Sequence, residues 1–344
     1  MFLFIVKLLT LLQLLKNAVS ATDNPVIDCA LYPPKSTTVN FFLNTKSVEN
    51  FSVTADEKSL KGAPFIPGSD TVILIVHGFG VSSKTKNIAA LQKAYINGPQ
   101  NHNVLMVDYS DVIGDVSHLN TEEYALRYGV AVECDFPIMV NATTNIIEMI
   151  QNWRPEISKI HMVGHSLGGE IIGQSGSHLK DKGKPVHRLS ALDPAGPLFS
   201  STHITAKSGL FVDVYHTQIA DQRGITIAVG NVDIYINNAI VQDGCLNEKT
   251  HDEALGCSHQ AAVLYFAESI NNQNMKASRC DEIKTIVKNL DALKNIDKNN
   301  NNVLSSTCDK KGNSEGDQIV FGENISLNAK GVYFIRIPTI PEIA

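Results

Sequence analysis

The pentapeptide Gly164-His165-Ser166-Leu167-Gly168 is the feature that most constrains how this chain can fold. It follows the apolar segment Lys159 to Val163, which predicts a strand, and it precedes a helix that we expect to begin near Glu170. A serine in a sharp strand-to-helix turn needs neighbours without side chains two positions away, so that the backbones can pass closely. The pattern therefore predicts a nucleophile elbow with Ser166 as the nucleophile.

Further short, β-branched segments predict other strands of the same sheet: Thr71 to Val76, Val104 to Val107, Leu189 to Leu192 and Phe211 to Tyr215. Between two of them, Val130 to Trp153 has apolar residues at helical spacing. Alternating strands and helices predict an α/β class, with a mainly parallel central sheet covered by helices on both faces. An amphipathic stretch, Asp281 to Asn302, precedes a last predicted strand, Gly331 to Ile337, and no second domain is indicated.

The first 20 residues predict a signal peptide, which leaves residues 21–344 as one domain. Their apolar run is short, Lys7 and Lys16 interrupt it, and Ala18-Val19-Ser20 supplies the small residues that signal peptidase requires. A signal anchor is the alternative. We expect a secreted, extracellular protein.

Six cysteines in a chain that enters an oxidising compartment predict three disulfides. Spacing alone leaves the pairing open, and the pairs that we expect are Cys245–Cys257, Cys280–Cys308 and Cys29–Cys134. Asn50, Asn141 and Asn324 begin Asn-x-Ser/Thr triplets, which are acceptors for N-glycosylation and agree with secretion.

Composition argues against several classes of partner. Lysine and arginine number 29 against 35 acidic residues, a formal charge of −6, and no basic tract concentrates positive charge for nucleic acid. The cysteines lack the C-x-x-C pairs of a zinc site, and we expect neither a metal nor a cofactor. No obligate protein partner is evident.

A serine hydroxyl needs a base, and the base needs an orienting acid. On the α/β-hydrolase fold the acid and then the histidine follow the serine along the chain. Among the histidines after Ser166 we choose His259, which we expect to begin a helix just after a disulfide, and we assign a structural role to His216. The acid is Asp193, because it ends a strand at the catalytic edge, with Asp213 as the alternative one strand later.

An oxyanion hole requires two backbone N–H groups directed at the developing negative charge. Leu167, directly after the nucleophile, should supply one. The loop Val76-His77-Gly78-Phe79-Gly80 follows an early strand and should supply the other from Phe79. For His161, Asp108 and His165 we expect packing or supporting roles.

Four segments in this order resemble the pancreatic lipase family: Val76-His77-Gly78-Phe79, Gly164-His165-Ser166-Leu167-Gly168, Leu192-Asp193-Pro194-Ala195 and Cys257-Ser258-His259. The likeness covers most of the mature chain. It implies a secreted lipase with an α/β-hydrolase domain, a lipid ester substrate at a membrane or lipid-droplet interface, and no metal in the chemistry. It also implies the triad Ser166, Asp193 and His259.

Two departures bear on the substrate. Triacylglycerol lipases of the family carry a long lid between the cysteines that correspond to Cys245 and Cys257, whereas only Leu246 to Gly256 intervene here. The residues after Gly331 are too few for the C-terminal β-sandwich that many members carry. In both traits the chain is similar to insect and venom members of the family with phospholipase A1 activity. These enzymes release sn-1 acyl chains.

Phospholipase-type members of the family tend to have a short segment in the region of His216 to Cys245. In this chain that segment is not especially short. A triacylglycerol lipase or a soluble carboxylesterase therefore stays open as an alternative. The alternative from another class is a catalytically silent lipid-binding protein, similar to yolk proteins of this fold, although those lose the triad that this chain retains.

Overall fold

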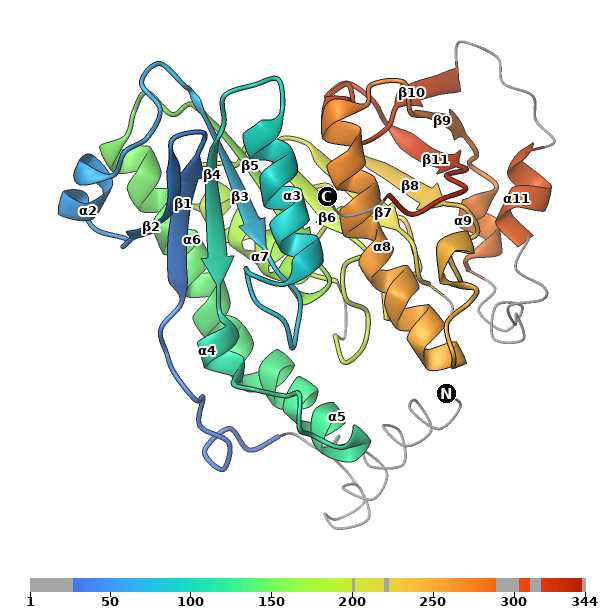
Figure 1. Cartoon of the computed structure of the whole chain (residues 1–344), viewed down its shortest axis with the longest axis horizontal. Coiled ribbons are helices and arrows are strands. Elements are labelled where there is room, and N and C mark those ends of the chain that lie inside the picture. Colours follow the sequence, from blue (N-terminus) through green and yellow to red (C-terminus); the bar gives the residue numbers. More distant parts are fainter. Residues whose placement is uncertain (1–26, 200–201, 220–222, 289–302, 310–316, 342–344) are drawn as a thin grey trace.

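An 11-stranded sheet runs through the part of the chain that the structure describes (Figure 1). The computed structural model describes residues 27–199, 202–219, 223–288, 303–309 and 317–341, so the expected signal peptide lies outside it. The strands are β1 (Asn40–Thr45), β2 (Val48–Val53), β3 (Thr71–Val76), β4 (Asn103–Asp108), β5 (Lys159–His165), β6 (Arg188–Leu192), β7 (Val212–His216), β8 (Val232–Ile236), β9 (Lys276–Arg279), β10 (Gln318–Val320) and β11 (Gly331–Ile335).

The strand order is β10-β9-β11-β8-β7-β6-β5-β3-β4-β1-β2. Neighbours from β11 through to β4 pair in parallel, whereas β1, β2, β9 and β10 pair antiparallel at the two edges. The α/β class and the mainly parallel sheet are thus confirmed. The edge strands were not predicted from the sequence.

Helices cover both faces of the sheet. The longer helices are α3 (Lys86–Asn97), α5 (Thr121–Val130), α6 (Phe136–Trp153), α7 (Leu167–Asp181) and α8 (His251–Asn271). Short helical segments are α2 (Glu57–Gly62), α4 (Ser110–Ile113), η1 (Ala131–Asp135), η2 (Asp243–Cys245), α9 (Ile283–Ile286), α11 (Val303–Cys308) and η5 (Gly322–Asn324).

Strand β3 contributes to two apolar cores, one on each face of the sheet, because successive side chains of a strand point to opposite faces. Val72, Leu74 and Val76 join the core under α6 and α7. Ile73 and Ile75 join the other core, under α3 and α8, which lie side by side on the near face in Figure 1. A strand buried on both faces is continuously apolar, which is why this segment was easy to recognise in the sequence.

The chain reverses its direction across the sheet at β3 and β5. After β3 it adds β4 on one side, and it then returns to place β5 on the other side of β3. In open α/β sheets ligands bind where the strand order reverses, outside the carboxyl ends of the strands. The loop after β3 and the turn after β5 both lie there.

Three helix predictions need correction. Helix α7 begins at Leu167, directly after Ser166 and three residues before the expected Glu170. Helix α8 begins at His251, so His259 lies inside the helix rather than at its start. Its real start carries a capping box, in which Thr250 and Glu253 satisfy each other's backbone N–H groups. The segment Val130 to Trp153 is the end of α5, the π-helix η1 and α6.

Disulfides join Cys29 to Cys134, Cys245 to Cys257 and Cys280 to Cys308, the pairs expected from the sequence. Among the residues described, no helix is long and apolar enough to cross a membrane.

Candidate active site

Ser166 lies in a strained turn between β5 and α7. Its φ of 54° and ψ of −123° fall outside the regions that residues with side chains ordinarily adopt. A Cβ on Gly168 would lie 2.4 Å from the Val76 carbonyl oxygen, and one on Gly164 would lie 2.3 Å from the Gly168 oxygen. Gly164 therefore lets β5 pass close to the start of α7, and Gly168 lets the elbow pass close to the end of β3. The strain and the close approach are what the pentapeptide pattern predicted.

Asp193 and His259 form a buried hydrogen bond. Asp193 directly follows β6 with a φ of 46°, is 0% exposed, and accepts from His259 Nδ1 at 2.5 Å. The backbone N–H groups of Thr217 and Gln218 donate to its Oδ1 at 2.8 and 3.1 Å. A carboxylate held from two sides fixes the ring of His259, so that its Nε2 can serve as the base. Ser166 and His259 line one pocket.

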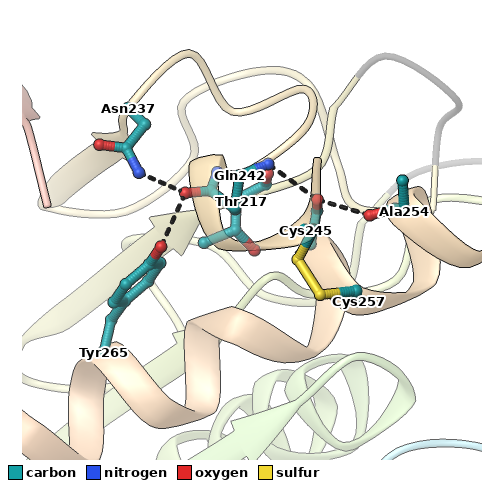
Figure 2. Close-up of a disulfide and its surroundings, with 8 residues drawn as sticks. Thr217, Asn237, Gln242, Cys245, Ala254, Cys257 and Tyr265 are labelled. Carbon is teal, nitrogen blue, oxygen red and sulfur yellow. Dashed lines mark hydrogen bonds between the residues drawn. A yellow bond between two sulfur atoms is a disulfide. The ribbon is translucent and has the colours of Figure 1, made fainter. Parts of the chain in front are cut away.

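Gln242 bonds to Thr217, which holds Asp193, and to Ser258, which directly precedes His259. Its Nε2 donates to the Thr217 oxygen at 2.8 Å, and Thr217 N in turn holds Asp193. Its backbone N donates to Ser258 Oγ at 2.8 Å, one residue before His259. Figure 2 shows this side chain beside the Cys245–Cys257 disulfide, where Asn237 and Tyr265 both donate to its Oε1.

His165 supports the backbone of His259. Its Nε2 lies 3.0 Å from the His259 carbonyl oxygen, which can only accept, so Nε2 carries the proton. The two rings lie 4.8 Å apart. Burial, together with the neighbouring charge of His259, lowers the pKa of His165 to about 3. The ring is therefore neutral near pH 7 and can bond to His259 without a competing charge.

His77 sets the orientation of the loop that follows β3. Tyr109 N donates to His77 Nε2 at 3.2 Å, which places the proton on Nδ1, 2.8 Å from the Gly78 oxygen. A trans peptide is planar, so a fixed Gly78 carbonyl also fixes the opposite direction of the Phe79 N–H. His77 thereby orients the N–H group that the sequence analysis proposed for the oxyanion hole.

The pocket has a volume of about 200 Å³, and the rings of Phe79, Tyr124 and Tyr128 form part of its wall. Phe79 packs edge-on against Tyr124 and Tyr128 of α5, with ring centroids 5.1 Å apart in both pairs. The polar lining comes from His165, Ser166, His259 and three further side chains, Asn87, Arg223 and Gln260. An apolar wall with a few polar groups at one point is typical of a ligand site.

A second Ser-His-Asp cluster lies within β5, β6 and β7, away from the edge of the sheet where Ser166 and Asp193 lie. Ser190 Oγ lies 2.8 Å from His161 Nε2 and donates to Asp213 Oδ1 at 2.9 Å. Arg188 Nη2 pairs with Asp213 Oδ2 at 2.7 Å, and Ser190 is 0% exposed. Because the carboxylate bonds to the serine and to an arginine rather than to the histidine, this cluster cannot relay a proton as a triad does.

Asp213, the alternative acid, therefore lies in this ion pair and not beside His259. The other polar residues given supporting roles also have structural partners. His216 Nε2 bonds to Asp233 Oδ1 at 2.9 Å, and Asp108 accepts from the hydroxyl and backbone of Ser83. Gln242 and Ser258 were missed, because nothing local in the sequence marks a glutamine as part of a buried network.

In the described ranges, no group of three or more His, Cys, Asp or Glu side chains could hold a metal ion.

Several known proteins are similar in sequence to this chain over most of its length. The family profile described as Lipase matches residues 16–317. Probable phospholipase A1 magnifin of Vespa magnifica is 29% identical over 255 residues, covering 71% of this chain and 72% of magnifin. Phospholipase A1 of Vespa velutina is 28% identical over 254 residues, covering 71% and 80%. Lipoprotein lipase of Mus musculus is 27% identical over 249 residues, covering 64% of this chain and 48% of that enzyme.

Proposed function

The chain belongs to the pancreatic lipase family of carboxylic-ester hydrolases, and within it we propose that this enzyme is a secreted phospholipase A1. The observation that carries the proposal is the Asp193–His259 bond beside Ser166, in a pocket with an aromatic wall and a short lid. The substrate is a phospholipid presented at a membrane surface.

His259 takes the proton of Ser166, whose oxygen attacks the ester carbonyl. The N–H groups of Phe79 and Leu167 stabilise the tetrahedral oxyanion, and His259 then protonates the leaving alcohol. Water hydrolyses the acyl-enzyme by the same route. Asp193 holds the ring and stabilises its charged form.

The segment between Cys245 and Cys257 supports a phospholipid over a triacylglycerol. Helix α8 already begins at His251, so much of this short segment belongs to the helix that carries His259. Few residues remain to form a separate cover over the pocket. The wasp relatives named phospholipase A1 agree with this preference, and the similarity to lipoprotein lipase keeps a triacylglycerol lipase as the second candidate.

The aromatic wall formed by Phe79, Tyr124 and Tyr128 is suited to an acyl chain, because burying apolar surface stabilises the complex by roughly 25 cal/mol per Å².

Secretion is supported by the three disulfides, which persist in oxidising compartments. We include glycans on Asn50, Asn141 and Asn324 in this proposal. Asn50 and Asn141 are exposed, whereas the Asn324 amide donates to the Ser269 oxygen at 3.0 Å. We therefore expect the lowest occupancy at Asn324, which intact-mass analysis of the secreted protein would measure.

Fatty-acid release from phosphatidylcholine vesicles and from a triacylglycerol emulsion, side by side, tests the proposal. Ser166→Ala is the blank and should fold normally but lose turnover, by about 10⁶-fold for removal of such a nucleophile. Release of sn-1 chains from the vesicles supports a phospholipase A1. Preference for the emulsion identifies a triacylglycerol lipase, and no release above the blank on either substrate would reject the enzyme in favour of a lipid-binding protein.

A further inference from the structure

Arg223 brings a positive charge to the wall of the pocket. Among the described residues that line the pocket it is the only Lys or Arg, and none of them is Asp or Glu. Its side chain is 27% exposed and is one of those that line the pocket.

The backbone of Arg223 is tied to the segment that carries Asp193. The Arg223 oxygen accepts from Gly196 N at 3.0 Å, and the next residue, Gly224, forms a β-bridge with Ala195. A Cβ on Gly224 would lie 2.6 Å from Asp193 Oδ1. Because Gly224 has no side chain, the segment that carries Arg223 can lie close to the Asp193 carboxylate.

The guanidinium lies one helical turn from His259. Arg223 Nη1 is 3.7 Å from the position that a Cβ on Gly256 would take. Residues three and four positions apart share one face of a helix, and one turn rises about 5.4 Å. Gly256, His259 and Gln260 accordingly line the same wall of the pocket, with the cation at one end and the base at the other.

We propose that Arg223 binds the phosphate of a phospholipid whose ester lies at Ser166. The glycerol backbone separates ester from phosphate by a span comparable to the turn that separates His259 from the guanidinium. A planar guanidinium binds phosphate oxygens with two parallel hydrogen bonds, and it is weakly hydrated, which favours this contact. This inference rests on the proposed function and names the residue that selects its substrate.

The ion pair between Arg223 and Asp252 does not prevent this role. Asp252, on the first turn of α8, pairs with its Nη2 but is 54% exposed. Ion pairs near the surface contribute little free energy, so a phosphate that enters the pocket can replace or share the contact. The charge also reaches the facing wall, since it opposes the rise that burial causes in the pKa of Tyr124.

The test compares two substrates that differ only in the phosphate headgroup. Monomeric dihexanoylphosphatidylcholine and dihexanoylglycerol present the same esters without an interface, so interfacial charge plays no part. Arg223→Gln should lower kcat/KM on the phospholipid roughly 10- to 100-fold, the usual effect of losing a hydrogen bond to a charged group. On dihexanoylglycerol it should change by less than about twofold, and Arg223→Lys should fall between. The matched control is Arg279→Gln, which removes another arginine paired with an aspartate on the surface, Asp281.

Equal losses on both substrates, or no loss on the phospholipid, would overturn the role of Arg223 while leaving the ester hydrolase intact. A wild type that hydrolyses dihexanoylglycerol alone refutes both this role and the phospholipase. If the wild type hydrolyses neither substrate, the proposed function fails. Calorimetric binding of dihexanoylphosphatidylcholine to Ser166→Ala then tests the phosphate contact of Arg223 separately. Weaker binding when Arg223→Gln is added supports the phosphate contact, and unchanged binding overturns it.

Discussion

Asp193 and Asp213 are both fully buried aspartates of neighbouring strands, but their environments differ. Asp193 bonds to a histidine and to two backbone N–H groups, so its charge can act on the ring of His259. Asp213 is neutralised by Arg188 and bonded by the Tyr215 hydroxyl. The same residue type therefore pairs with a histidine directly after one strand and with an arginine within the next.

Substituting each aspartate by asparagine should separate these roles. Asp193→Asn should retain the fold and lower kcat by about 10³- to 10⁴-fold, because the histidine then adopts the wrong tautomer. Asp213→Asn removes the carboxylate that pairs most closely with buried Arg188 and should cost roughly 3 to 5 kcal/mol of stability, with kcat preserved in the folded fraction. Initial rates and thermal unfolding of both variants check this. An active Asp193→Asn beside a folded but inactive Asp213→Asn would transfer the acid to Asp213.

Glu170, in the first turn of α7, should make stability depend on pH. Burial raises its pKa from 4.5 to about 7, against hydrogen bonds from Thr202 and from the backbone of His203 and Ile204. The folded state therefore holds a proton that the unfolded state has already released between these pH values. Stability should fall by roughly 3 kcal/mol as pH rises from about 4.5 to about 7, and then stay constant.

Denaturant unfolding of wild type and Glu170→Gln at a series of pH values measures this effect. Other groups, including His203, titrate in both proteins, so the difference in unfolding free energy isolates Glu170. We expect the difference to change across this interval and to be flat above it. A constant difference from pH 4.5 to 7 would contradict the raised pKa.

At the scale of elements, α8 unites the disulfide, the base and the core. Its apolar residues pack against α3 and the sheet, while Gly256, His259 and Gln260 face the pocket. The sequence analysis placed His259 correctly after the cysteine but began the helix eight residues too late. The segment between the cysteines was considered only as a short lid, although Thr250 and Glu253 form the capping box that marks a helix start.

The loop before α8 depends on Gln242. Gln242→Met would leave the Asn237 amide, the Tyr265 hydroxyl and the Thr217 oxygen without this partner, and each lost contact in the interior costs about 1 to 3 kcal/mol. We expect a marked loss of stability, and a fall in kcat larger than any change in KM, because the Gln242 side chain holds Thr217, whose backbone N–H in turn holds Asp193.

Thermal unfolding and steady-state kinetics measure both effects, with Gln151→Met as the control at a partly exposed glutamine. Unchanged kcat in the folded variant would limit Gln242 to a structural role.

Over the whole molecule, the topology gathers residues from distant parts of the chain. The loop with Phe79 follows β3, Ser166 follows β5 and Asp193 follows β6, because parallel strands end at one edge of the sheet. His259 comes from α8, which crosses the near face of the sheet in Figure 1. Disulfides then restrain the unfolded chain over very different spans.

Removing each disulfide by paired Cys→Ser substitution should lower the stability by an amount that depends on the length of the loop that the disulfide closes. The sequence separations are 105 for Cys29–Cys134, 28 for Cys280–Cys308 and 12 for Cys245–Cys257. Loss of loop-closure entropy predicts the same order of destabilisation, from about 5 down to about 3 kcal/mol. Denaturant unfolding of the three variants tests it. A larger effect for Cys245–Cys257 than for Cys29–Cys134 would show that native contacts outweigh chain entropy here.

The sequence by itself determined the features that depend on local chemistry. Apolar strands buried on both faces, paired glycines around Ser166 and an aspartate before proline each have a local physical cause, and they predicted the sheet, the elbow and the candidate acid and base. Only the tertiary structure decided what depends on residues far apart in the chain. It separated Asp193 from Asp213, placed Arg223 beside the pocket and joined Gln242 to both the acid and the base, because hydrogen-bond partners across a sheet leave no periodic pattern in the sequence.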